Sequence, residues 1–408
     1  MRKLFRLLFL IAYGLFFCLA AYTPVAAQPF QMTSSTQFLW GDDDTGSSQA
    51  ILAQYLRFSY SPEASKLSAA GYGRIYDAFS SGSIRDNGVN GRLYYLYLDV
   101  APIENVSLRL GRQYVNFSSG SSLLDGGTLY LHKLGPIGVT LAGGRDIKFN
   151  LDSEQSRAGN YFMGVDVHLE GVRNTQLGIS YVRRSDDWSL AREEFGLNFR
   201  YIYKFLSPYT EVRYDYLSKV VEEATVGLDI FPMTNMAIKA EYYQSFPTFN
   251  STDIYSVFAV DKYHEYMVRI DYTLDTVLPM TPFVSYARQT YEDDENANNF
   301  IIGARFYPIK ELTVNLSFDK RTGYGGKTWG FEATGDYRIN SKFLISAGAQ
   351  YDTYMRPDQD GNSYAQRYWL GGQWIINKNL SAIARFEEDI NENFDHRLLG
   401  RVGLNWNL

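Results

Sequence analysis

The feature that most constrains this chain is a two-residue alternation of apolar and polar side chains, which continues from about residue 28 to the C-terminus. Between residues 312 and 319 the apolar positions are Leu312, Val314, Leu316 and Phe318, and the positions between them are polar. A period of two predicts a β-strand with one apolar and one polar face. The same pattern recurs in 223–230, 329–339 and 397–408. Each run has about ten residues, the length that a tilted strand needs to cross a bilayer.

The connections between these runs alternate between short and long. Short turns with Pro, Gly or Asn occur near 101–102, 134–136, 231–232, 307–308, 339–340 and 377–379. Longer polar segments occur at 41–49, 80–90, 246–261, 292–298 and 356–363. This asymmetry is typical of outer-membrane barrels. The pairing predicts an up-and-down antiparallel barrel of about 22 strands, from Phe30 to Leu408, with 18 or 20 as alternatives because the hairpins in 117–146 are weakly marked.

Composition excludes several other classes. Only one long apolar run exists, at the N-terminus, so a multi-span helical membrane protein is excluded. The net charge is −6, which argues against a nucleic-acid partner. A soluble β-sandwich or barrel would have to bury the charged face of these strands at a high desolvation cost. A water-filled lumen removes that cost, so the alternation favours an all-β transmembrane barrel.

The first 27 residues have the pattern of a secretory signal peptide. Arg2, Lys3 and Arg6 precede an apolar stretch over 7–21, and the small residues of 25–27 follow it. The alternative is an uncleaved anchor helix, for which the apolar run is short. Cys18, the only cysteine, lies within this segment, so the expected mature barrel, residues 28–408, has no disulfide.

In these respects residues 28–408 resemble a Gram-negative outer-membrane porin. The last strand, with Leu404, Trp406 and Leu408 in alternation, is similar to the signal that the outer-membrane assembly machinery reads, although it ends in Leu where Phe is commonest. The segment 107–114, which contains Gly-Arg-Gln at 111–113, is similar to the strand that enters the constriction loop of many porins.

That resemblance implies that the loop after this strand, 116–126, folds into the lumen; a plain surface loop is the alternative. The residues implied in the constriction are Asn116, Ser118, Ser119, Ser121 and Asp125.

Strand parity places many charged side chains on the inner wall. The predicted pore-lining residues are Arg109, Arg213, Arg269, Arg305, Arg338, Arg367, Arg385, Glu211, Asp215, Glu265 and Asp271. Opposed ladders of the two signs would set a field across the pore. Alternatively, neighbouring charges neutralise one another and stiffen the wall. Arg112 shares the parity of the outward Leu110, which places it at the membrane rim or makes Gly111 a bulge.

No catalytic or metal-binding motif is present. The four histidines stand singly and none has metal-ligand spacing, so we expect no metal, no cofactor and no enzyme activity. The acidic clusters at 42–44 and 292–295 fit solvated loop charge better than a divalent-ion site bridging lipopolysaccharide.

The early start of the alternation leaves no room for a plug domain. The sequence therefore predicts a passive outer-membrane channel for small polar solutes. Two alternatives remain: a barrel that sheathes a partner, for example in an electron-transfer or export complex, and an enzyme at the barrel rim. A haem motif for the electron-transfer case is missing from this chain. Expected partners are membrane lipid, lipopolysaccharide, the assembly machinery and small polar solutes; a homo-oligomer is compatible with such a barrel.

Overall fold

A computed structural model describes residues 30–42, 48–62, 65–78, 89–149, 154–247, 262–292, 295–324, 326–355, 363–392 and 394–408. The predicted signal peptide and most of the expected long segments, including 80–88, 248–261 and 356–362, lie outside these residues. Within the described ranges, no helix is long and apolar enough to cross a membrane.

The described residues form 24 strands. These are β1 (Phe30–Asp42), β2 (Ser48–Tyr60), β3 (Leu67–Ala78), β4 (Val89–Ile103), β5 (Val106–Phe117), β6 (Gly120–Leu134), β7 (Ile137–Asp146), β8 (Lys148–Phe149), β9 (Glu154–Gln155), β10 (Tyr161–Leu169), β11 (Thr175–Asp186) and β12 (Ser189–Tyr201). The second half consists of β13 (Leu206–Asp215), β14 (Val220–Met233), β15 (Met236–Ser245), β16 (Tyr263–Tyr272), β17 (Met280–Tyr291), β18 (Asn296–Ile309), β19 (Leu312–Gly323), β20 (Lys327–Arg338), β21 (Phe343–Met355), β22 (Ser363–Ile375), β23 (Leu380–Asn391) and β24 (Phe394–Asn407).

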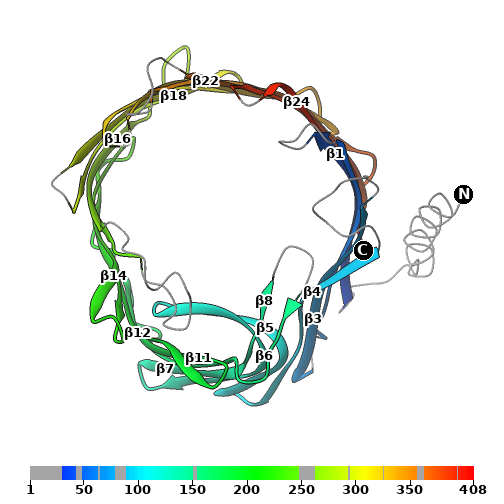
Figure 1. The fold of residues 1–408 in the computed structure, drawn as a ribbon, viewed down its shortest axis with the longest axis vertical. Coiled ribbons are helices and arrows are strands. Elements are labelled where there is room, and N and C mark those ends of the chain that lie inside the picture. Colours follow the sequence, from blue (N-terminus) through cyan, green and yellow to red (C-terminus); the bar gives the residue numbers. More distant parts are fainter. Residues whose placement is uncertain are drawn as a thin grey trace, which may run out of the picture.

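Twenty-two of these strands form one closed antiparallel barrel, shown in Figure 1. Each strand pairs with its neighbours in the chain, except that β7 pairs with β10 across the small β8–β9 hairpin. The first and last strands close the barrel, with Thr33 opposite Asn407 and Gly41 opposite Leu399. Closure leaves the sheet without an open edge at this seam. The prediction of a 22-stranded up-and-down barrel is confirmed.

The alternation places apolar side chains on the outside of the barrel. Val226, Phe331 and Leu404 are each about half exposed, as expected for side chains that would face lipid. Aromatic pairs lie near both ends of this outer face, with Phe343 against Trp374 on the short-turn side. Trp40 packs against Phe386 on the other side. Aromatic girdles at both interfaces are a property of membrane barrels.

The strands extend past the proline-containing segments that we expected to be turns. Pro102, Pro232 and Pro308 lie inside β4, β14 and β18, each where the strand register shifts. Because proline has no N–H to donate, it is tolerated where the ladder is already interrupted. The turns themselves follow a few residues later, at 104–105, 234–235 and 310–311.

Candidate channel lumen

Residues 116–126, expected as a loop, form the tip of the β5–β6 hairpin instead. Asn116 pairs with Ser121, and Arg112 pairs with Asp125, so the two strands continue almost to the end. Only Ser118 and Ser119 form the turn. Burial alternates from Gln113 to Phe117, with Val115 and Phe117 buried and Tyr114 exposed, as expected for a strand; in β6 the adjacent Leu123 and Leu124 are both buried.

The hairpin leaves the barrel wall along a line of glycines. Pairing between β4 and β5 ends at Leu96 and Arg112, while β5 continues to Phe117. Gly111 has a φ of 120°, which only glycine adopts readily, and a Cβ there would overlap the carbonyl oxygen of Leu96. A Cβ on Gly126 would likewise overlap the backbone of Gly143. The absence of side chains lets the hairpin bend inward, and Figure 1 shows it inside the ring.

A small hydrophobic core holds the hairpin to the wall. Val115, Phe117 and Leu124 of the hairpin are buried with side chains from three wall strands: Ala142 of β7, Phe162 of β10 and Val182 of β11. The ring centroids of Phe117 and Phe162 lie 6.4 Å apart. Burial of one Phe or Leu side chain contributes about 1.5–3 kcal/mol, so this core is a substantial anchor.

Polar contacts fix the turn of the hairpin. The Oγ atoms of Ser118 and Ser180 are 2.8 Å apart, and the backbone N–H of Ser119 donates to Ser180 Oγ at 2.8 Å. Arg184 donates to the carbonyl oxygen of Ser121. A Cβ on Gly196 would overlap the backbone at Ser119, so glycine is needed for this close approach. The turn therefore docks on the inner face of β11 and β12.

Buried charges lie next to the docked turn. Arg192 forms ion pairs with Glu194 at 2.9 Å and with Glu222 at 3.4 Å. Glu194 is 1% exposed, and one of its oxygens would be 3.2 Å from a Cβ placed on Gly120 of the hairpin. The hairpin thus shields this cluster from the lumen. Shielding strengthens the attraction between the charges but makes any unpaired charge costly.

Arg112 lies in a bend of the strand and not at the lipid rim. Its side chain is only 10% exposed, and it forms ion pairs with Asp125 at 2.8 Å and with Glu154 of β9 at 2.6 Å. The register of β4 and β5 continues through Gly111 without a shift, so the backbone turns there instead of bulging. Arg112 therefore ties the β5–β6 hairpin to the β8–β9 hairpin.

Most of the predicted pore-lining charges form pairs with their neighbours. The N–O distances are 2.7 Å for Arg109–Asp99, 3.5 Å for Arg213–Glu223, 2.8 Å for Arg269–Asp271, 2.8 Å for Arg367–Asp389 and 2.8 Å for Arg385–Glu387. Arg305 donates to Asn315 at 2.8 Å, and Gln289 donates to Glu265 at 2.6 Å. The arrangement matches local neutralisation along the wall better than opposed ladders of charge.

Three predicted residues differ in their surroundings. Glu211 lines a recess of about 490 Å³ between the hairpin and the wall. Asp215 is 1% exposed and accepts hydrogen bonds from the N–H groups of Leu217 and Ser218, so it stabilises a turn and does not line the pore. Arg338 is the last residue of β20, at the short-turn end.

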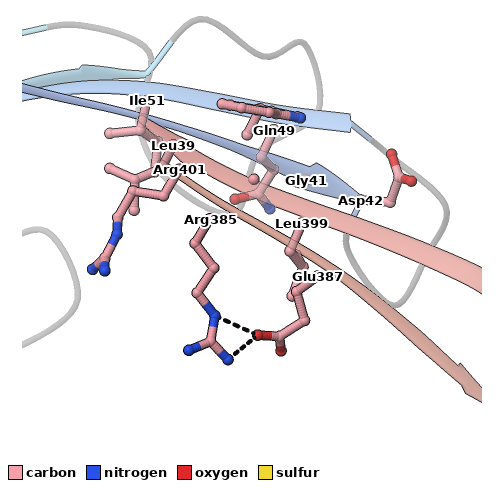
Figure 2. A pocket seen from close by; sticks show the side chains of 11 residues that line it. Leu39, Gly41, Asp42, Gln49, Ile51, Arg385, Glu387, Leu399 and Arg401 are labelled. Atoms are coloured by element: carbon pink, nitrogen blue, oxygen red, sulfur yellow. Dashed lines mark hydrogen bonds and ion pairs between the residues drawn. The ribbon is translucent and has the colours of Figure 1, made fainter. Parts of the chain in front are cut away.

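A second recess, of about 340 Å³, lies where β1 and β2 meet β23 and β24 (Figure 2). Arg385 and Arg401 stand opposite each other in the register of β23 and β24. Arg385 pairs with Glu387, whereas Arg401 has no ion pair or hydrogen bond among the described residues. Figure 2 shows both guanidinium groups extending away from the strands. Strand parity places Arg401 on the polar face, but does not show that it is unpaired.

The structure also brings together three residues that sequence reasoning did not connect. Ser107 Oγ lies 3.2 Å from His132 Nε2, and His132 Nδ1 lies 3.1 Å from Glu170. His168 is close to the same carboxylate, at 3.4 Å. These residues come from β5, β6 and the turn after β10, so no short motif contains them. The sequence has no motif for a Ser–His constellation, and the register of the strands is what brings these side chains together.

Comparison with known proteins supports the fold. No protein-family model matches the chain, and no curated protein sequence matches it. Among solved structures, the P pilus usher PapC translocation pore aligns with a TM-score of 0.54 and 10% identity, covering 92% of this chain and 99% of that one. The fold is that of an outer-membrane β-barrel.

Two further solved structures align at lower TM-scores. OccK5 (OpdH) of Pseudomonas aeruginosa has a TM-score of 0.47 and 11% identity, over 93% of this chain and 98% of its own. OccAB1 of Acinetobacter baumannii has a TM-score of 0.47 and 9% identity, over 93% and 96%.

Proposed function

We propose that this protein is an outer-membrane channel for passive diffusion of small polar solutes, narrowed by the β5–β6 hairpin. The observation that carries the proposal is the hairpin itself, which bends off the wall at Gly111 and docks its turn on Ser180. The inner wall around it is polar and its charges are paired, which suits a water-filled lumen. A barrel of this size encloses an aqueous channel unless something occludes it.

Conductance of the purified protein in planar bilayers tests this proposal. The intact barrel should conduct ions, and deletion of 118–123 should raise the single-channel conductance because the docked turn is removed. If the intact protein conducts but the deletion has no effect, the hairpin is not the constriction. If the intact protein does not conduct, the barrel is a sheath for a partner and the channel proposal fails.

The same proposal includes an export signal at the N-terminus and an assembly signal in the last strand. Residues 1–27 would direct export and be removed, leaving residues 28–408 as the barrel. Leu404 is outward and half exposed in the last strand, with Trp406 at the same parity, so this face is available to the assembly machinery and later to lipid.

A second candidate function, an esterase at the barrel rim, rests on Ser107, His132 and Glu170. Their order and distances match a nucleophile, a base and an orienting carboxylate. A fluorophosphonate probe tests it, because such a probe labels only an activated serine. Labelling that disappears in Ser107→Ala would support the enzyme, and absence of labelling would leave these residues as a structural network.

A further inference from the structure

A line of aromatic rings from β3, β4 and β6, bridged at one point by Arg109 of β5, runs along the inner wall. Tyr94 stacks on Tyr72 at 4.8 Å between ring centroids, and Tyr72 contacts Tyr95 at 5.8 Å. Tyr95 then contacts Tyr97 at 5.6 Å. Arg109 lies 4.0 Å above the Tyr97 ring and 5.8 Å from the Tyr130 ring. Each step is within the range of aromatic or cation–π contact.

The line faces the lumen and follows the pore. In β4 the outward side chains are Leu96 and Leu98, both more than a third exposed, so Tyr95 and Tyr97 point inward. Tyr94 is the extra residue at the register shift opposite Tyr72, and its ring stacks inward with Tyr72. Tyr130 lies near the short-turn end of β6, while Tyr94 lies in the middle of β4. The rings therefore form a path along the pore axis.

The polar groups beside the rings include both donors and acceptors. Arg109 donates twice to Asp99, at 2.7 and 3.1 Å, so the central charge of the path is already balanced. An anion that bound to Arg109 would have to separate the Arg109–Asp99 ion pair, which is costly. A neutral solute can instead stack on the rings and exchange hydrogen bonds with the tyrosine hydroxyls and the exposed edge of the ion pair.

We propose that these rings, together with Arg109 and Asp99, form a luminal track that binds neutral sugars during passage. A pyranose ring has a flat C–H face that stacks on an aromatic side chain and a rim of hydroxyls that both donate and accept hydrogen bonds. Neighbouring rings lie 4.8–5.8 Å apart, so a sugar can contact the next ring before it leaves the previous one. This inference rests on the channel function proposed above and adds its substrate class.

The test measures block of the ion current by sucrose and raffinose in planar bilayers. Both sugars should reduce the current of the intact channel in a saturable way. Tyr72→Ala and Tyr97→Ala should each weaken the apparent affinity about three- to tenfold, the value of one aromatic contact. Tyr72→Phe keeps the ring and should retain most of the affinity. Tyr209→Ala, which removes a tyrosine of β13 outside the track, is the matched control and should leave the block unchanged.

The outcomes separate the two proposals. An intact protein that conducts no ions overturns the channel function itself. A conducting protein that neither sugar blocks, or whose block survives both alanine substitutions, overturns the track alone. Block by benzoate without block by either sugar also overturns it, in favour of an aromatic acid. Ion conductance of each variant confirms that it has folded and inserted.

Discussion

The backbone N–H of Ser119 donates to the Oγ of Ser180, 61 residues further along the chain, at 2.8 Å. Ser180 is 1% exposed, so this bond lies in a site that water does not reach freely. It joins the turn of a hairpin that has left the wall to the inner face of β11. Because an unpaired buried N–H is costly, Ser180 specifies where the turn docks.

Ser180→Ala should loosen the docked turn. The substitution leaves the N–H of Ser119 buried without its acceptor, which costs about 1–3 kcal/mol. Amide hydrogen exchange in 117–122 should therefore accelerate while exchange in the wall strands stays slow. Ser346→Ala, on β21 and far from the hairpin in the sheet order, is the control. Unchanged protection in 117–122 would show that the hydrophobic core alone holds the hairpin.

A side chain at Gly196 should displace the turn. Even a Cβ there would overlap the backbone at Ser119, so Gly196→Val should force the turn off β12 and raise the single-channel conductance. Gly335→Val is the matched control, because the nearest atom to its Cβ would be 3.9 Å away. A normal conductance in Gly196→Val would mean that the docked turn does not limit the flow of ions.

The barrel could be predicted from the sequence, but the inward hairpin could be predicted only in outline. A period of two identifies strands and their faces, as it does for Val226 and Leu404. This two-residue period is the same in a strand that stays in the barrel wall and in a strand that leaves the wall. The departure depends on Gly111, Gly126 and Gly143, which are far apart in the chain and meet only through the strand register.

The ion-pair partners of the charged residues could not be predicted from the sequence either. Parity places Arg269 and Arg401 on the same inner face, but the first has Asp271 two residues away and the second has no such neighbour. Asp215 has the parity of a pore-lining residue, but its carboxylate accepts hydrogen bonds from the following turn, because its strand ends there. The periodicity of the sequence predicts which face of the barrel a side chain occupies. Its contacts depend on the strand register and on where each strand ends.

The pH dependence of stability should include a contribution from Glu170, which lies in the turn after β10. The backbone N–H of Lys133 and the side chain of His132 hold the pKa of Glu170 below its ordinary value. Its stabilising contribution should therefore be complete above the ordinary pKa of about 4.3 and be lost as pH falls through the lowered value. Urea unfolding of Glu170→Gln should show lower stability than the parent at pH 7, with the difference shrinking in acid. A difference that is constant with pH would contradict this.

Arg401 should have more influence on ion selectivity than the neutral Arg269–Asp271 pair taken together. Its guanidinium has no carboxylate partner among the described residues, so its charge acts on ions in the lumen, whereas Asp271 offsets the charge of Arg269. Arg401→Gln and Arg269→Gln remove the same formal charge, which makes them a matched pair. In a salt gradient, the reversal potentials of both single variants should shift toward cation selectivity, because Arg269→Gln leaves the negative charge of Asp271 uncompensated. Screening in a channel of this width makes both shifts small. The distinguishing measurement is therefore the double variant Arg269→Gln/Asp271→Asn, which removes a neutral pair. It should leave the reversal potential at its original value, while Arg401→Gln alone moves it; a shift in the neutral-pair variant as large as that in Arg401→Gln would show that pairing does not decide selectivity.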